Sequence, residues 1–172
     1  MRILLIGCGR WGREHLRVLA ELGVEVWVAD LDPARLAWAT KMFGVDPGRT
    51  TLDFRSALDA VDAVDVVTPA DSHLALVRQC LEAGKDCFVE KPLTRTSAEA
   101  RVLAEVVRQT GRLLQVGHIF RFHPATGLLR RCLAAGRVGQ IRYVSGRFSG
   151  FKRPRADVGV TQTDAIHYFD LF

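Results

Sequence analysis

The feature that most constrains the fold is a short apolar run that ends at a cluster of glycines near the amino terminus. Residues 3–6 read ILLI, and the glycine-rich segment 7–12 (GCGRWG) follows directly. A run of this kind is typical of a parallel strand buried on both faces. Apolar residues then recur at helical spacing as far as Gly23, and a second apolar run, residues 24–29, leads to Asp30. The sequence therefore predicts a strand, a helix and a second, parallel strand.

Each glycine of this segment has its own expected role. Gly7 permits a tight turn, Gly9 lets a pyrophosphate approach the backbone, and Gly12 lets the helix lie close to the strand. The unpaired amides at the start of the helix attract phosphates. Asp30 follows Gly12 by eighteen residues, a spacing at which its carboxylate accepts hydrogen bonds from an adenosine ribose. We expect a dinucleotide-binding site, although a glycine triplet alone is equally compatible with a simple turn.

The charges around Asp30 favour NAD over NADP. A carboxylate at this position repels the 2′-phosphate of NADP, and neither Lys nor Arg directly follows it. Arg35, five residues further on, is long enough to reach such a phosphate, so NADP is the less favoured alternative.

The chain is long enough for one domain with a well-buried core and a shorter additional segment. Of the 172 residues, 48% are hydrophobic and 25% are charged, as in ordinary globular proteins. The net charge of +5 is spread over many segments and implies no nucleic-acid partner, although a basic surface suits an anionic substrate. No apolar run is long enough for a membrane span or a signal-peptide core. We expect a cytoplasmic protein without membrane association, and reduced cysteines whose spacing matches no metal site.

Strands and helices are expected to alternate up to about residue 119. This alternation predicts an α/β fold, a Rossmann-type doubly wound parallel sheet with its ligand crevice beyond the carboxyl ends of the strands. Glycine or polar residues stand at five of those ends, namely Gly9, Asp30, Thr68, Glu90-Lys91 and His118. Further strands are expected at residues 50–52, 63–67, 86–89 and 113–116, and helices at 33–43, 54–58, 72–83 and 97–110. Their expected caps are Asp32, Asp53, either Asp71 or Ser72, and a capping box from Thr96 to Glu99.

The pattern changes after residue 119, which divides the chain into an expected NAD(P)-binding domain, 1–119, and the start of a second, α+β domain, 120–172. Within the second part we expect a helix from Pro124 to about Gly136 and a strand over residues 140–149. A basic loop is expected at 150–155, and a final helix starts near Thr163.

Taken in this order, the motifs resemble the Gfo/Idh/MocA oxidoreductase family, named for glucose-fructose oxidoreductase and inositol dehydrogenase. The most specific of them is the triplet Glu90-Lys91-Pro92. The resemblance implies an NAD(P)-dependent enzyme that oxidises or reduces a sugar, a polyol or a nucleotide sugar. Ala70 stands where the family usually has Asn, and family chains are considerably longer. The other matching segments are 7–12, Asp30 to Arg35, Thr68-Pro69 with His73, 83–85, Gly117-His118 with Arg121-Phe122, and 136–139.

Three residues are candidates for catalysis. Lys91 can hydrogen-bond the reacting hydroxyl or act as a base, although it can equally cap its strand or pair with Glu90. His167 resembles the second-domain histidine of the family, a general base that titrates near neutrality. Asp164 is expected to orient it from one helix face, or the two form a surface pair. The family acid commonly lies four residues before the histidine, where this chain has Thr163.

The expected cofactor contacts extend beyond the glycine segment. His73 and His118 either touch the nicotinamide ribose or bond to loop backbone. Arg121 and His123 face either the substrate pocket or solvent, and the basic run 152–155 is a solvated loop or a phosphate contact. The full set of cofactor candidates is Gly7, Gly9, Arg10, Trp11, Gly12, Asp30, Arg35, Thr68, Pro69, His73, Glu90, Lys91 and His118.

Two other functions stay open alongside the oxidoreductase. One is a non-catalytic dinucleotide-binding protein, and the other is a truncated subunit that another chain completes. An apolar carboxyl-terminal segment, residues 166–172, cannot bury itself alone. We therefore expect a homo-oligomer whose interface includes residues 141–148 or the last helix.

Overall fold

The computed structural model describes residues 1–147 and 157–172. They form two compact units, Met1–Val116 and Gly117–Phe172. The first unit is a parallel sheet flanked by helices, and the described part of the second is helical. No helix in these described ranges combines the length and the apolar character that a membrane span needs.

The sheet of the first unit has the strand order β3-β2-β1-β4-β5-β6, and every adjacent pair is parallel. The chain moves outward in one direction from β1 and then returns to β4 on its other side, which makes the β1/β4 boundary a topological switch point. The expected doubly wound parallel sheet is therefore confirmed. Its strands are β1 (Arg2–Ile6), β2 (Glu25–Ala29), β3 (Thr50–Thr51), β4 (Ala63–Val66), β5 (Asp86–Val89) and β6 (Leu114–Val116).

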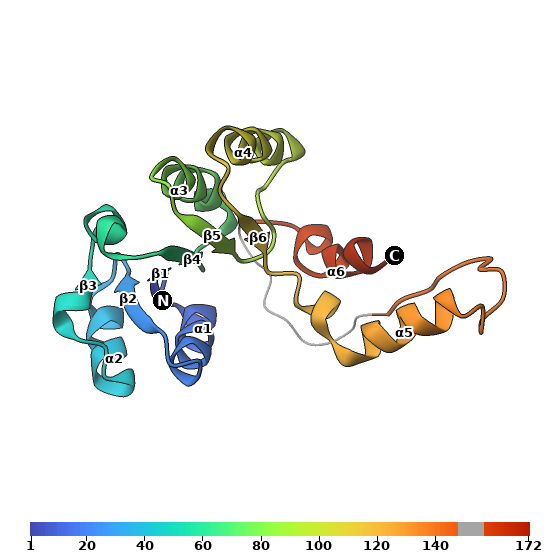
Figure 1. Ribbon diagram of the computed structural model, residues 1–172, viewed down its shortest axis with the longest axis horizontal. Coiled ribbons are helices and arrows are strands. Elements are labelled where there is room, and N and C mark those ends of the chain that lie inside the picture. Colours follow the sequence, from blue (N-terminus) through green and yellow to red (C-terminus); the bar gives the residue numbers. More distant parts are fainter. Residues whose placement is uncertain (148–156) are drawn as a thin grey trace. The chain divides into compact units, whose positions relative to one another are not determined.

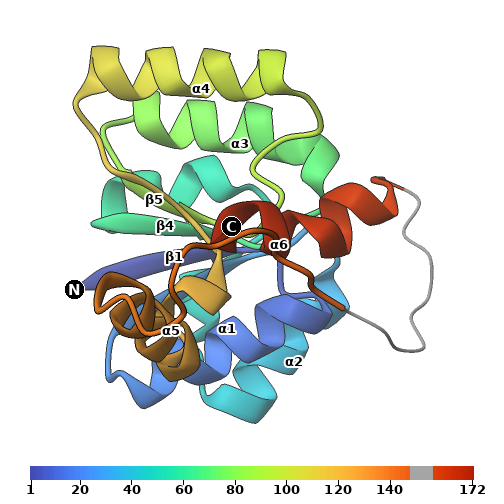
Figure 2. The same cartoon turned by 90° about the vertical axis from the view of Figure 1, so that its right-hand side faces the viewer.

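Helices cover both faces of this sheet. Figure 2 shows α1 (Arg10–Glu21) and α2 (Pro33–Phe43) on one side, with α3 (Ala70–Glu82) and α4 (Ser97–Thr110) on the other. Strand β1, at the centre (Figure 1), contributes to both cores because its side chains alternate. Leu4 and Ile6 belong to the core that includes residues of α3 and α4, and Leu5 belongs to the core beside α1 and α2.

Side-chain caps set where two of these four helices, α2 and α4, begin. The Asp32 carboxylate accepts from the amide of Ala34 at 2.9 Å, and Thr96 forms the expected reciprocal capping box with Glu99. The prediction that Asp71 or Ser72 caps α3 is wrong. That helix begins one residue after Pro69, and neither Asp71 nor Ser72 caps it. Proline holds the preceding residue in an extended conformation, so the helix can start directly behind it. Asp71 and Ser72 then lie inside the first turn.

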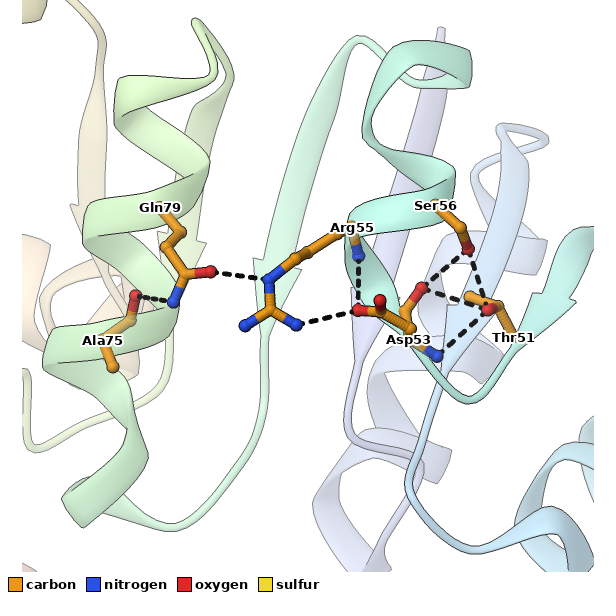
Figure 3. A network of polar contacts seen from close by, with 6 residues as sticks. All are labelled: Thr51, Asp53, Arg55, Ser56, Ala75 and Gln79. Atoms are coloured by element: carbon orange, nitrogen blue, oxygen red, sulfur yellow. Dashed lines mark hydrogen bonds and ion pairs between the residues drawn. The ribbon is translucent and has the colours of Figure 1, made fainter.

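A polar network joins the edge of the sheet to α3 (Figure 3). It centres on η2 (Phe54–Ala60), a 3₁₀ helix that Asp53 caps as expected. Arg55 Nε donates to Gln79 Oε1 on α3 at 2.9 Å, and another guanidinium nitrogen of Arg55 lies 3.0 Å from Asp53 Oδ1. The hydroxyls of Thr51 and Ser56 lie 3.0 Å apart. These contacts attach the two-residue strand β3 and η2 to the helical layer.

The second unit differs from the expectation in one element. Helix α5 (Pro124–Ala134) begins at Pro124 as expected, and α6 (Ile166–Leu171) follows a π-helical turn, η4 (Thr161–Ala165). The predicted strand is absent from residues 140–147, and the rest of that strand and the basic loop 150–155 lie outside the described residues. An alternating pattern forms a strand only when a neighbour pairs with it. The described part of the second unit offers no such strand.

We predict that Gly12→Ala strongly destabilises the first unit. A Cβ atom at Gly12 would lie 1.9 Å from the carbonyl oxygen of Gly7, so helix α1 would have to move away from β1. Overpacking of this kind costs about 1–3 kcal/mol, and a backbone clash lies at the upper end of that range. Urea unfolding of the full chain measures the loss.

Gly9→Ala is the matched control for that experiment. Gly9 has a φ of −72°, and its Cβ would meet only an Arg35 guanidinium nitrogen, at 3.8 Å. The free energy of unfolding of Gly9→Ala should stay within about 0.5 kcal/mol of that of the unsubstituted chain. Equal losses for the two alanines would contradict the proposed close contact between α1 and β1.

Candidate functional site

In the turn between β1 and α1, the backbone at Gly7 lies close to the backbone of Val67, whereas Gly9 is less crowded. Gly7 has a φ of +95°, and a Cβ there would lie 2.4 Å from the carbonyl oxygen of Val67. Only glycine fits this turn. Gly9, in contrast, would bring a Cβ atom within 4 Å of only one atom, an Arg35 guanidinium nitrogen at 3.8 Å, and no side chain caps the helix that starts behind it. An uncapped helix start with an accessible backbone is the arrangement that binds a pyrophosphate.

Asp30 lies directly at this turn. Its carboxylate accepts from the amide of Cys8 at 2.7 Å and from the amide of Asp32 at 2.9 Å. The residue is 7% exposed. A guanidinium nitrogen of Arg35 lies 3.3 Å from the Asp30 carboxylate, and Arg35 is also paired with Asp32. The two residues that were expected to choose between NAD and NADP therefore contact each other at the end of β2.

The segment after β4 holds Thr68 and Pro69 in a loop and His73 at the start of α3. The Thr68 hydroxyl lies 2.7 Å from that of Ser72, and Pro69 ends the extended segment before α3. His73 is 1% exposed. Its Nε2 lies 2.9 Å from the carbonyl oxygen of Thr68, and its Nδ1 lies 2.9 Å from that of Pro92. Of the two alternatives for His73, bonding to loop backbone is therefore present in the structure, and a ribose contact stays a prediction.

Glu90 and Lys91 follow β5, at the same edge of the sheet. The Glu90 amide donates to the carbonyl of Val66 at 2.9 Å, which continues the pairing with β4. One oxygen of the Glu90 carboxylate accepts from the Lys91 amide at 3.0 Å. The Lys91–Pro92 peptide bond is cis. The Glu90 carboxylate thus interacts with the backbone of Lys91. A contact between Glu90 and the cofactor stays a prediction.

A histidine that the sequence did not single out connects these elements. His15, on the second turn of α1, places Nδ1 2.8 Å from the Asp65 carboxylate and Nε2 3.3 Å from the Glu90 carboxylate. Burial by itself lowers the pKa of His15, but the hydrogen bonds to both carboxylates outweigh it and raise the pKa to about 9. Burial opposes ionisation of Glu90 too, yet the bond from His15 lowers the pKa of Glu90 overall.

One sequence signal pointed to this network. Asp65 interrupts the apolar strand at residues 63–67, which is buried on both faces. A buried carboxylate needs a partner, and His15 is one of four side chains in the first turns of α1 that can be a cation and donate twice, together with Arg10, Arg13 and Arg17.

Two further cofactor candidates lie at the start of α1. Arg10 and Trp11 are both exposed, and the Trp11 side chain is 60% accessible. Exposure at an uncapped helix start is compatible with covering a bound phosphate, which stays a prediction for both residues.

The second unit groups its own polar candidates around Asp170. Arg121 donates to this carboxylate at 3.1 Å, and His118 Nδ1 lies 3.8 Å from it. His167 is 8% exposed, and its ring meets Phe120 edge-on at 4.7 Å. Asp170 belongs to none of the sequence motifs, so no sequence signal marked it as a site residue.

Asp164 and His123 are also placed in the second unit. The Thr163 hydroxyl lies 3.2 Å from Asp164, within the π-helical turn. We expected Asp164 and His167 to lie on one helix face, an expectation that depends on the residue spacing of a regular α-helix. Asp164 lies in a π-helical turn, which has more residues per turn, so this spacing does not apply there. His123 caps α5, where its Nδ1 accepts from the amide of Ala125 at 3.1 Å.

Comparison with known proteins decides the family. A family model described as an oxidoreductase family with an NAD-binding Rossmann fold (GFO_IDH_MocA) matches residues 1–118. The chain belongs to the Gfo/Idh/MocA family. Its first unit is accordingly an NAD-binding Rossmann domain, and the open, uncapped glycine turn fits that cofactor.

Relatives in the Gfo/Idh/MocA family are dehydrogenases. UDP-N-acetylglucosamine 3-dehydrogenase of Acidithiobacillus ferrooxidans is 34% identical over 172 residues, which cover 99% of this chain and 53% of that protein. Inositol 2-dehydrogenase of Rhizobium meliloti is 30% identical over 178 residues, with 99% and 53% covered. The chain thus spans about half the length of the curated relatives it matches.

A solved structure of this family contains the cofactor. The scyllo-inositol dehydrogenase of Lactobacillus casei, determined with NAD(H) and scyllo-inositol bound, is 28% identical and superposes with a TM-score of 0.75. The match covers 81% of this chain and 42% of that one. A putative myo-inositol dehydrogenase from Sinorhizobium meliloti has a TM-score of 0.82 at 27% identity, with 99% and 54% covered.

We predict that stability falls as His15 loses its proton. Because the pKa of His15 is raised from 6.5 to about 9 on folding, the contribution is complete below pH 6.5 and disappears as the pH rises through about 9. The full loss is about 3 kcal/mol. Urea unfolding between pH 6 and pH 10 measures it. His123→Gln, which alters an exposed cap, should leave the profile unchanged. A flat profile for the unsubstituted chain would contradict the charged state of His15.

Proposed function

We propose that this protein is an NAD-dependent oxidoreductase that transfers hydride between nicotinamide and a secondary alcohol of a sugar, polyol or nucleotide sugar. The observation that carries the proposal is the position of Lys91. It follows β5, one strand away from the β1/β4 switch point, at the same edge of the sheet as the glycine turn and Asp30. Ligands of such sheets bind at this edge.

Each chemical role falls to a residue of this chain. When bound, NAD accepts or supplies the hydride. Lys91 donates a hydrogen bond to the reacting hydroxyl or removes its proton. His167, from the second unit, is the proposed general base, and Asp164 is proposed to stabilise its charged form. The fixed backbone of Lys91 favours catalysis, because a group held in position reacts faster than a mobile one.

The substrate class is proposed from the names of the relatives. They act, by name, on UDP-N-acetylglucosamine and on inositols, which all present secondary hydroxyls. The positive net charge of the chain also suits a substrate that carries phosphate.

A non-catalytic dinucleotide-binding protein, or a subunit completed by another chain, is the second candidate. The observation in its favour is that the chain spans about half the length of its curated relatives. Such a protein would keep the glycine turn and Asp30 without turnover.

We predict that the chain binds NADH and that Lys91→Ala abolishes turnover without abolishing binding. Loss of a positioned proton donor or base lowers the rate by about 10²–10⁴-fold, whereas the glycine turn and Asp30 stay intact. Fluorescence titration with NADH measures binding, and NAD reduction with a panel of polyols, sugars and nucleotide sugars measures turnover. Lys41→Ala, at an exposed position on α2, is the matched control and should keep full activity.

The two candidates give opposite results in this experiment. NADH binding without oxidation of any alcohol would exclude the catalytic candidate and support the binding protein. No NADH binding would exclude both.

We also propose that the protein forms a homo-oligomer through the second unit. Helix α5 contains no buried residue, and Leu128 and Leu129 on it are 55% and 50% exposed. Phe169 and Phe172 at the carboxyl terminus are exposed as well. Exposed apolar side chains gathered on one small unit are typical of an association surface.

We predict that light scattering over a wide concentration range gives a mass above 19.1 kDa, and that Leu129→Glu shifts it towards the monomer. A charge introduced into an apolar interface is costly to bury. Arg130→Glu, on the same exposed helix, is the control. A monomer at every concentration would reject the interface.

A further inference from the structure

The network around His15 has a feature that the proposed chemistry does not use. Both ring nitrogens of His15 face carboxylates, at 2.8 Å on Asp65 and 3.3 Å on Glu90. An ionised carboxylate only accepts hydrogen bonds, and a neutral imidazole has a single N–H. Only the imidazolium form can therefore donate to both groups. The side chains of His15, Asp65 and Glu90 are 18%, 9% and 17% exposed, so water can replace little of what deprotonation removes.

Glu90 transmits this contact to Lys91. While Oε1 of Glu90 faces His15, Oε2 accepts from the Lys91 amide at 3.0 Å. The carboxylate therefore bridges helix α1 and the backbone of Lys91. Turning the carboxylate towards solvent would break both contacts, because its two oxygens move together.

A second anchor holds the other side of Lys91. His73, on α3, contacts the carbonyl oxygens of Thr68 and Pro92 at 2.9 Å each. This anchor joins two loops through backbone carbonyls and involves no carboxylate. The segment 90–92 thus has one anchor on α1 and one on α3, and of these two the anchor on α1 consists of opposite charges.

We propose that His15 is a positioning residue which, as an imidazolium, fixes Glu90 and through it the backbone of Lys91, so that loss of its proton releases Lys91 from its reactive position. This inference rests on the role proposed for Lys91 in the reaction. His15 itself touches neither substrate nor cofactor in this scheme.

Among residues 1–147 and 157–172, the charges that face His15 belong to the network. Asp65 comes from β4 and Glu90 from the end of β5, and the charge of Lys91 acts on Glu90. His15 has an aromatic neighbour in Phe88, whose ring centroid lies 6.0 Å from its own. Other charged side chains of α1 and α2 interact elsewhere: Glu14 with Arg17, Arg13 over Trp38, and Arg35 with Asp30.

The test follows the His15 ring and the Lys91 backbone together by NMR in the full chain. Carbon-detected spectra avoid the fast amide exchange of alkaline solution. In the unsubstituted protein, the Lys91 backbone signals should titrate with the midpoint of His15, near pH 9. The backbone of Lys41, on α2, serves as the internal reference and should not follow. Lys91 signals that stay constant while His15 titrates would overturn the proposal.

Two conservative variants separate transmission from general destabilisation. Asp65→Asn removes one negative charge from His15 and should lower its midpoint by about 1 unit or more, with Lys91 still following at the new midpoint. Glu90→Gln should also lower the midpoint of His15, but it should uncouple Lys91. If both variants uncoupled Lys91, or neither did, Glu90 would not be the link.

Catalytic measurements distinguish failure of this inference from failure of the proposed function. His15→Gln should lower kcat by about 10-fold, with the NADH dissociation constant within about 2-fold of the original. A protein that binds no NADH would refute the proposed function, while the NMR coupling could still be present. A protein that turns over normally with uncoupled Lys91 signals would refute the role of His15 alone.

Discussion

The hydrogen bond from the Cys8 amide to the Asp30 carboxylate is the contact on which the site depends. It joins the glycine turn after β1 to the end of β2 at 2.7 Å. The same carboxylate holds the amide of Asp32, the residue that caps α2. One buried carboxylate thus fixes both the glycine turn, where we expect the phosphates of the cofactor, and the first helix turn beyond β2. A buried carboxylate needs such backbone donors, because they replace the hydrogen bonds to water that burial removes.

The Rossmann sheet was predictable because its signals are local. Apolar runs that end at glycine, and caps such as Asp32 and Thr96, act within a few residues of the chain. The predicted start of α3 was wrong for an equally local reason. Asp71 and Ser72 are both good capping residues, and the sequence alone does not show that Pro69 already ends the extended segment before them. Such an error moves a boundary by one or two residues and leaves the edge of the sheet unchanged.

The second unit was less predictable, because its elements depend on partners far along the chain. Residues 140–147 alternate as a strand does, but the described residues contain no strand beside them. The shared face expected of Asp164 and His167 stays a prediction for a related reason. Helical spacing assumes a regular turn, and the π turn at Thr161–Ala165 depends on packing that no periodicity encodes.

His15 shows a third kind of limit, in which the signal was present and was not used. Asp65 breaks an apolar strand that the sequence already placed in the core, and a charge there requires a cation or a set of donors. That requirement predicts a basic partner on the neighbouring helix, where Arg10, Arg13 and Arg17 compete with His15 for the role. The motif selected Glu90 as a cofactor residue, which stays a prediction, and the structure adds that its carboxylate faces His15 and the Lys91 amide. A motif therefore marks a position as important without stating its task. Counting the hydrogen bonds that a buried charge needs is what separates a residue that binds the ligand from one that holds its neighbour in place.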